Sequence, residues 1–125
     1  MTFKFDNVYL NETAVVAGFV EARNPLFSYF DKTYKNYYMD KSSVEYSETV
    51  MQKDAMDILF KKSNLSISDI DLFIGGDLQN QIAASCYAFD DKCVPFLGLY
   101  SACATSCEEL IVASSLIDSK WDGEK

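Results

Sequence analysis

Residues 95–110 read PFLGLYSACATSCEEL, and this stretch decides the fold. Its apolar residues 96–100 predict a short buried strand, and the small residues behind them leave room for a tight turn. From about 104 to 117 the sequence predicts a helix that is apolar nearly all round, which is typical of a buried helix. A strand that turns through Cys103 directly into a helix indicates an α/β sheet, in which ligands bind beyond the carboxyl ends of the strands.

Strand and helix patterns alternate along the rest of the chain as well. The expected strands are 14–20, 71–74 and 96–100, and the expected helices are 47–62, 79–89 and 104–117. The aromatic-rich stretch 24–40 has no clean period and predicts an irregular loop with one short helix. This order predicts an α/β fold with a mostly parallel sheet and helices on both faces. We expect the three strands to be neighbours in one sheet and the last helix to be the most buried.

Composition narrows the class of protein. The chain has 125 residues, of which 49% are hydrophobic, so it is long and apolar enough to bury the core of one domain. Its net charge of −8 argues against a nucleic-acid-binding protein, because no basic patch is present to neutralise phosphates. No apolar run reaches the roughly 20 residues of a membrane-spanning helix. The first residues, MTFKFDNVYLNET, lack the apolar core of a signal peptide. We therefore expect a soluble chain without signal peptide or transmembrane segment.

The four cysteines stand at positions 86, 93, 103 and 107, and the chain has no histidine. None of them forms a C-x-x-C pair, and their spacings do not fit the usual zinc sites. We therefore expect free thiols, no metal site and no cofactor.

Two predicted strand-to-helix turns, at 75–77 and 101–103, should open onto the same edge of the sheet. Backbone N–H groups at a helix start would favour an anion, and they would also favour the thiolate of a cysteine there. The candidate ligand-binding residues are Cys103, Ala104, Thr105, Ser106 and Asp77.

Each candidate also has a purely structural interpretation. Cysteine often only fills space in a core, which applies to Cys103 and more strongly to Cys107, one helical turn deeper. We expect Asp77 to cap its own helix rather than to contact a ligand.

Three stretches resemble one family. They are PLFSYFDKTY at 25–34, DIDLFIGGDLQNQ at 69–81 and VPFLGLYSACATSCEELIVASSLID at 94–118. They are similar to the N-terminal part of the stage V sporulation protein AD family, which has the thiolase fold. The resemblance implies a thiolase-like fold, with residues 1–125 forming an incomplete N-terminal half-domain, truncated before its last strands. It places Cys103 where thiolases carry their nucleophile.

The resemblance also implies a function. It points to a non-catalytic protein that binds dipicolinic acid and takes part in its uptake into the developing spore during sporulation. The implied partners are dipicolinic acid, other stage V sporulation transport proteins and a second copy, in a homodimer through the strand at 96–100. The implied location is the developing spore, peripheral to its inner membrane.

Two alternatives remain open. One is a fragment of a thiolase-like acyl-transferring condensing enzyme with a cysteine nucleophile, and the other is an assembly module without a ligand site. Acyl transfer of that type needs a partner base or oxyanion donor, usually histidine, beside the thiolate. Because the chain contains no histidine, we expect no enzymatic activity from it. Ser101 also stands where the family usually has glycine, so the turn departs from the family pattern.

Overall fold

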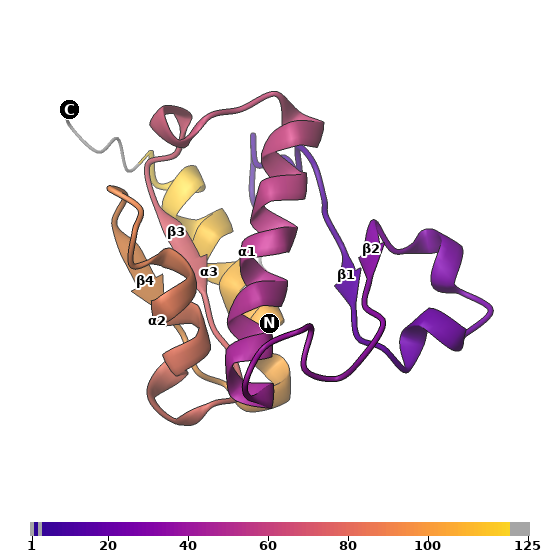
Figure 1. Ribbon diagram of the computed structural model, residues 1–125. Coiled ribbons are helices and arrows are strands. Elements are labelled where there is room, and N and C mark those ends of the chain that lie inside the picture. Colours follow the sequence, from indigo (N-terminus) through magenta and orange to yellow (C-terminus); the bar gives the residue numbers. More distant parts are fainter. Residues whose placement is uncertain (1, 3, 121–125) are drawn as a thin grey trace.

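The computed structural model describes residues 2 and 4–120, and it has the α/β architecture that the alternation predicts (Figure 1). The strands have only two or three residues each, and α1 is the longest helix of the described residues. In chain order the strands and α-helices are β1 (Val16–Ala17), β2 (Lys32–Thr33), α1 (Val44–Ser63), β3 (Phe73–Gly75), α2 (Ala83–Phe89), β4 (Phe96–Gly98) and α3 (Thr105–Asp118). Short 3₁₀ helices lie at Glu21–Arg23 (η1), Phe27–Tyr29 (η2), Ile67–Asp69 (η3), Asn80–Ile82 (η4) and Ala102–Ala104 (η5). No helix among these residues is both long enough and apolar enough to cross a membrane.

The strands form two separate parallel pairs rather than one sheet. β3 pairs with β4 from Phe73 opposite Phe96 to Gly75 opposite Gly98, as expected for neighbouring strands. β1 instead pairs with β2, with Val16 opposite Lys32. The prediction that all three expected strands share one sheet is therefore wrong for 14–20.

Reciprocal hydrogen bonds between Val15 and Asp31 explain why β1 pairs with β2. The Asp31 carboxylate accepts the Val15 N–H at 2.8 Å, and the Asp31 N–H donates to the Val15 carbonyl, also at 2.8 Å. Lys62 at the end of α1 donates to the Thr13 carbonyl at 2.6 Å and to the Asp31 carboxylate at 3.2 Å. The Val15 N–H and Lys62 lower the pKa of Asp31, so this carboxylate stays charged. β2 lies inside the stretch that sequence patterns assign to an irregular loop, and it offers β1 a nearby partner.

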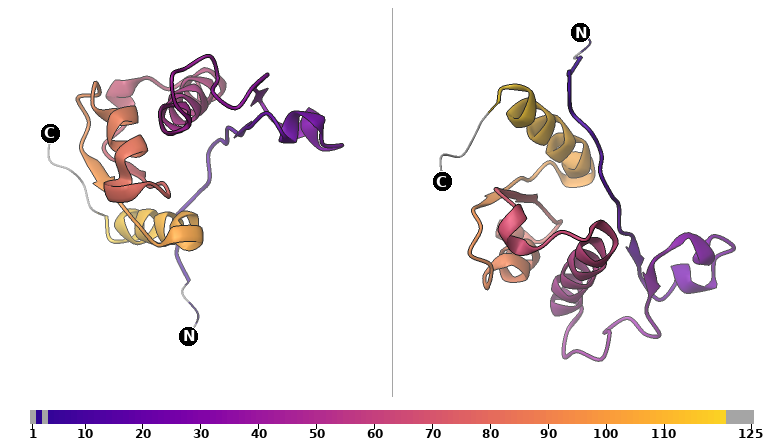
Figure 2. Two further views of the ribbon diagram at one scale, coloured as in Figure 1. Left: turned by 60° about the horizontal axis from the view of Figure 1, so that its bottom comes forward. Right: turned by 90° about the horizontal axis from the view of Figure 1, so that it is seen from above.

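The β3–β4 pair carries helices on both faces, as predicted. Figure 2 shows α3 on one face and α1 with α2 on the other. Phe89 of α2 packs on the strands, with ring centroids 4.6 Å from Phe73 and 5.2 Å from Phe96. Aromatic rings at these separations bury a large apolar area, so they hold α2 on the sheet.

α1 and α2 pack closely because α2 presents small residues. Ala84, Ser85 and Ala88 are almost completely buried. From α1, Thr49 donates to the Ala84 carbonyl at 3.3 Å, and the Gln52 amide donates to the Ser85 hydroxyl at 3.1 Å. The polar groups buried between the helices are thus paired, which is the condition for burying them at low cost.

Local capping sets the limits of α1 and η3. The Ser43 hydroxyl accepts the Tyr46 N–H at 3.2 Å at the start of α1, and Asn64 ends that helix in the left-handed conformation. The capping-box spacing of Ser66 and Asp69 is confirmed, since the Ser66 N–H donates to the Asp69 carboxylate at 2.8 Å.

Two glycines allow close approaches around the β3–β4 pair. A Cβ on Gly76 would lie 2.2 Å from the Leu99 carbonyl oxygen, and one on Gly98 would lie 2.0 Å from Cδ1 of Ile82. Ile82 has a φ of 48°, which is strained for a β-branched residue. Its side chain thus reaches into the space that the missing side chain of Gly98 leaves open.

The last helix contradicts the prediction that it is the most buried. Of its residues only Thr105 is buried, whereas α1 and α2 each have three buried residues. Leu110, Ile111 and Ile117 are about half exposed or more. As the sequence predicts, α3 has apolar residues nearly all round. The described residues cover this apolar surface mainly on the side of α3 that packs on β3.

Candidate functional site

The turn that carries Cys103 joins β4 to α3 through η5. Ala102 in this turn has a φ of 49°, in the left-handed region, so the chain reverses sharply just before the cysteine. Cys103, Ala104 and Ser106 are all exposed. The turn therefore presents a thiol, a small side chain and a hydroxyl to solvent at the start of α3.

The second predicted turn, at the end of β3, lies at the same edge of the sheet. The Leu99 N–H donates to the Gly75 carbonyl at 3.0 Å, which extends the parallel pairing to the ends of both strands. A Cβ on Gly76 would lie 2.5 Å from Cγ2 of Thr105, so the two turns are in direct contact. The prediction that both turns open onto one edge is confirmed.

Asp77 is buried and serves its own helix, as expected. Its carboxylate accepts the Gln79 N–H and the Ser85 N–H, each at 2.7 Å. Ser85 lies in the first turn of α2, where N–H groups have no partner within the helix. Both carboxylate oxygens are thus used to hold the segment from the end of β3 to α2.

Thr105 is also buried, and its hydroxyl is used within the turn. It donates to the Ala102 carbonyl at 2.8 Å and accepts the Ser101 N–H at 3.0 Å. The N–H groups of Ala104 and Thr105 donate to the carbonyls of Ser101 and Ala102. Thr105, one of the candidate ligand-binding residues, therefore uses its hydroxyl to fix the turn.

Two carboxylates lie one turn further along α3. Glu108 accepts a hydrogen bond from the Ser101 hydroxyl, so it is tied to the turn. Burial raises the pKa of Glu109, and the neighbouring charge of Glu108 raises it further, whereas a hydrogen bond from the Gly76 backbone opposes the shift. The edge that carries Cys103 is therefore acidic just behind the turn.

This shift of Glu109 predicts a pH-dependent effect of the Glu109→Gln substitution. Because the pKa is raised in the folded state above its ordinary 4.5, folding becomes less favourable as pH rises through the interval between those two values. Removing the charge should thus raise the thermal midpoint at pH 7 and change it less at about pH 3, where the carboxyl is protonated in both states. Thermal unfolding followed by circular dichroism checks this. The exposed Glu21→Gln variant is the control, and an equal gain at both pH values would contradict the prediction.

All four cysteines are exposed and free. The prediction that Cys107 lies in the core is therefore wrong, because α3 turns that residue toward solvent. Across residues 2 and 4–120, no group of three or more His, Cys, Asp or Glu side chains is placed to hold a metal ion.

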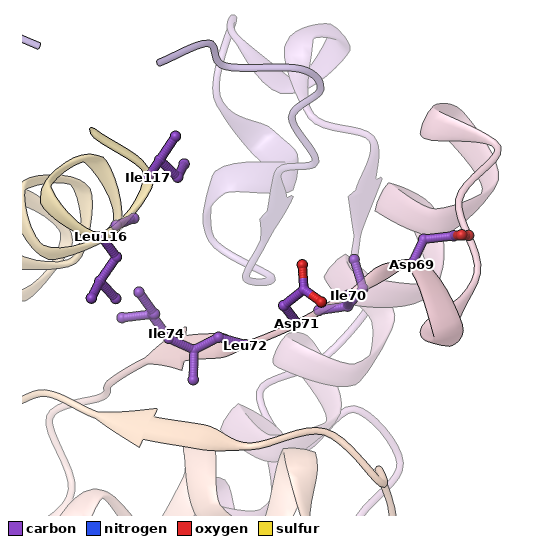
Figure 3. Close-up of a pocket in the computed structure, with 8 residues that line it drawn as sticks. Asp69, Ile70, Asp71, Leu72, Ile74, Leu116 and Ile117 are labelled. Atoms are coloured by element: carbon purple, nitrogen blue, oxygen red, sulfur yellow. The ribbon is translucent and has the colours of Figure 1, made fainter. Parts of the chain in front are cut away.

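An apolar groove of about 270 Å³ lies away from these candidates, between β3 with its lead-in and the end of α3 (Figure 3). Its lining residues come from those two segments: Asp69, Ile70, Asp71, Leu72, Ile74, Ala113, Leu116 and Ile117. In Figure 3, Leu116 points from the helix toward Ile74 on the strand side. Sequence reasoning missed this groove, although the all-round apolar character of the last helix is the signal that could have revealed it.

Comparison with known proteins gives one consistent result. A family model described as stage V sporulation protein AD (SpoVAD) matches residues 1–124. A protein named stage V sporulation protein AD from Bacillus subtilis (strain 168) is 38% identical over 118 residues, which are 94% of this chain and 35% of the relative. The chain thus spans about a third of the length of that relative. From this identity and the match over nearly its whole length, the chain belongs to the stage V sporulation protein AD family.

Proposed function

We propose that this chain is a non-catalytic sporulation protein that binds dipicolinic acid and takes part in its uptake into the developing spore. Membership of a family of sporulation proteins supports the setting. The observation that carries the ligand site is the exposure of Cys103, Ala104 and Ser106 in the turn at the start of α3. The thiolase-like fold, of which this chain would form part of the N-terminal half, is included in the proposal.

Some groups of the turn are suited to bind a small planar dianion. Its backbone N–H groups lie at the positive end of the α3 dipole, which favours negative charge. The N–H groups of Ala104 and Thr105 are used internally, so the ligand is proposed to bind the N–H groups of Cys103 and Ser106 and the Ser106 hydroxyl. The small side chains of Ala102 and Ala104 let a flat ring approach the backbone.

The nearby carboxylates oppose an anion, but their partners limit this effect. Asp77 is buried, and both of its oxygens accept backbone N–H groups. Glu108 is held by the Ser101 hydroxyl. The dianion is therefore proposed to contact the outer side of the turn, where Cys103 is exposed.

Partners and location complete the proposal. We place the protein in the developing spore, peripheral to its inner membrane, together with other stage V sporulation transport proteins. A homodimer would form along the open edge of β4, where Leu97 is exposed. Acyl-transfer chemistry is not proposed, because the chain has no histidine to act with the thiolate.

Titration calorimetry of dipicolinate into the chain tests the ligand site. Cys103→Ala should weaken binding by about 1–2 kcal/mol, because it removes one contact and leaves the turn unchanged. Cys103→Leu should abolish binding, because its larger side chain covers the backbone N–H groups.

Cys86→Ala is the matched control, since Cys86 is also an exposed cysteine but lies on α2. It should bind dipicolinate as the unmodified chain does. Absence of binding by the unmodified chain would contradict the proposal for these residues. If both Cys103 variants bound dipicolinate as strongly as the unmodified chain, the site would have to lie outside the turn.

A further inference from the structure

The last helix, α3, ends in a turn with left-handed backbone. The Ser119 N–H donates to the Ser115 carbonyl, and the Lys120 N–H donates to the Ile117 carbonyl, each at 3.0 Å. Lys120 has a φ of 54°, in the left-handed region. A left-handed residue directly behind the last helical turn, whose N–H bonds the carbonyl three residues back, is one half of the Schellman motif.

The other half of that motif involves the next residue, Trp121. In a Schellman motif this residue donates its N–H to the carbonyl five residues back, here that of Leu116, and its side chain commonly packs on the same residue. The sequence continues after Lys120 as WDGEK, in which Trp121 is the only hydrophobic residue. The Leu116 carbonyl accepts the Ser119 hydroxyl at 2.8 Å and has a second lone pair for another donor.

Leu116 is also part of the apolar groove at this end of α3. Ala113, Leu116 and Ile117 line the groove from the helix side, and Figure 3 shows Leu116 pointing toward Ile74 on the strand side. The groove has a volume of about 270 Å³. It is larger than the roughly 150 Å³ cavity that can hold a benzene ring, so it has room for the two fused rings of an indole.

The groove has the surface chemistry that a tryptophan side chain needs. Ile117 is 54% exposed, and Leu72, Ile74 and Leu116 are half-buried, so apolar surface is left for another apolar group to cover. Asp71 lines the same groove (Figure 3). A buried indole N–H needs an acceptor, and a carboxylate oxygen can accept several hydrogen bonds.

We propose that the chain turns back at Lys120 and that Trp121 inserts its indole into this groove, against Leu116. Trp121 is the best placed occupant, because it directly follows the residue whose backbone reverses the chain. This part of α3 is then covered by the chain's own continuation rather than by a ligand or a partner. Cys103 lies at the opposite end of α3, so the groove and the proposed ligand turn are separate.

Fluorescence of the 125-residue chain tests this inference, because Trp121 is its only tryptophan. In buffer the emission maximum should lie at a shorter wavelength than in urea, acrylamide should quench the emission less, and neither result should depend on protein concentration. Equal emission and quenching in buffer and in urea would overturn the inference. Protection that develops only as the concentration rises would also overturn it, because it would assign the indole to a contact between two copies.

A matched pair of serine substitutions locates the indole. Leu116→Ser removes the side chain against which Trp121 is proposed to pack, so it should shift the emission to longer wavelength and increase quenching. Leu110→Ser is the same substitution in the same helix, at a residue that is 62% exposed and outside the groove, so it should leave both measurements unchanged. Circular dichroism verifies that both variants are folded. Equal responses of the two variants would contradict the proposed position of the indole.

Two substitutions of Lys120 test the turn without altering the groove, and both remove the same charge. Lys120→Gly adopts the left-handed conformation at lower cost, so Trp121 should stay protected and the thermal midpoint should rise. Lys120→Pro excludes that conformation, because proline fixes φ at about −65°, and it removes the N–H that the Ile117 carbonyl accepts. It should therefore expose the indole to acrylamide.

An indole that stays equally protected in the glycine and proline variants would overturn the inference, because the groove would then be filled without the turn. All of these measurements are made without dipicolinate and leave Cys103 unchanged. Their outcome is therefore independent of the test of the proposed function.

Discussion

Gly76→Ala should lower the free energy of unfolding by about 3 kcal/mol, because the new methyl group has no room. It would lie 2.2 Å from the Leu99 carbonyl oxygen and 2.5 Å from Cγ2 of Thr105. The first of these atoms belongs to the backbone, so it cannot move without separating the ends of β3 and β4. The second is on the side chain that fixes the Cys103 turn.

Urea denaturation followed by circular dichroism measures this loss. Gly18→Ala is the matched control, because its Cβ would meet only the mobile end of the Glu21 side chain, at 3.1 Å. Its stability should stay within about 0.5 kcal/mol of that of the unmodified chain. If the two alanine variants were equally stable, the close contact between the two turns would be refuted.

Asp77→Ala should cost about 3 kcal/mol for a different reason. The substitution leaves the N–H groups of Gln79 and Ser85 without the carboxylate that now accepts both at 2.7 Å. Hydrogen bonds to a charged group contribute about 1.5–3 kcal/mol each, and an unpaired buried donor adds a desolvation penalty. Ser85 is completely buried, so water cannot replace the lost partner there.

Asp77→Asn separates charge from geometry. Its amide has one acceptor oxygen instead of two, so it can keep one of the two bonds and should fall between alanine and the unmodified chain. Asp90→Ala removes an exposed carboxylate at the end of α2 and should change stability by less than about 0.5 kcal/mol. Denaturant midpoints of the three variants give the comparison, and a tolerated Asp77→Ala would show that the segment before α2 holds without its cap.

Features encoded within a few residues could be predicted from the sequence. The alternation of strand and helix, the capping box at Ser66 and Asp69, and the capping role of Asp77 all depend on neighbours close in the chain. The placement of the two turns at one sheet edge also followed, because parallel strands share their carboxyl ends. These predictions needed no information about distant packing.

The first group of wrong predictions concerns strand pairing, for which segments distant in the chain compete. The strand expected at 14–20 pairs with β2, a two-residue strand whose aromatic surroundings gave no alternating pattern. Hydrogen bonds between Asp31 and Val15 decide that pairing, and periodicity does not detect a single side chain that accepts from a backbone N–H.

The second group of wrong predictions concerns which residues are buried. The apolar residues of α3 were read correctly, but an apolar surface does not reveal which part of it the described chain covers. The same limit applies to the candidate site, where Thr105 was expected to face a ligand and instead fixes the turn, while Cys107 was expected in the core and faces solvent.

The fit of Ile82 against Gly98 has a consequence for sequence change in the family. Ile82 keeps an unfavourable left-handed backbone while its side chain fills the space above a residue that has none. A side chain added at position 98 would collide with the Ile82 side chain. The same substitution would be tolerated if residue 82 had a shorter side chain. The two positions, far apart in the chain, are therefore expected to evolve together, with glycine retained at 98 wherever a long aliphatic residue occupies 82.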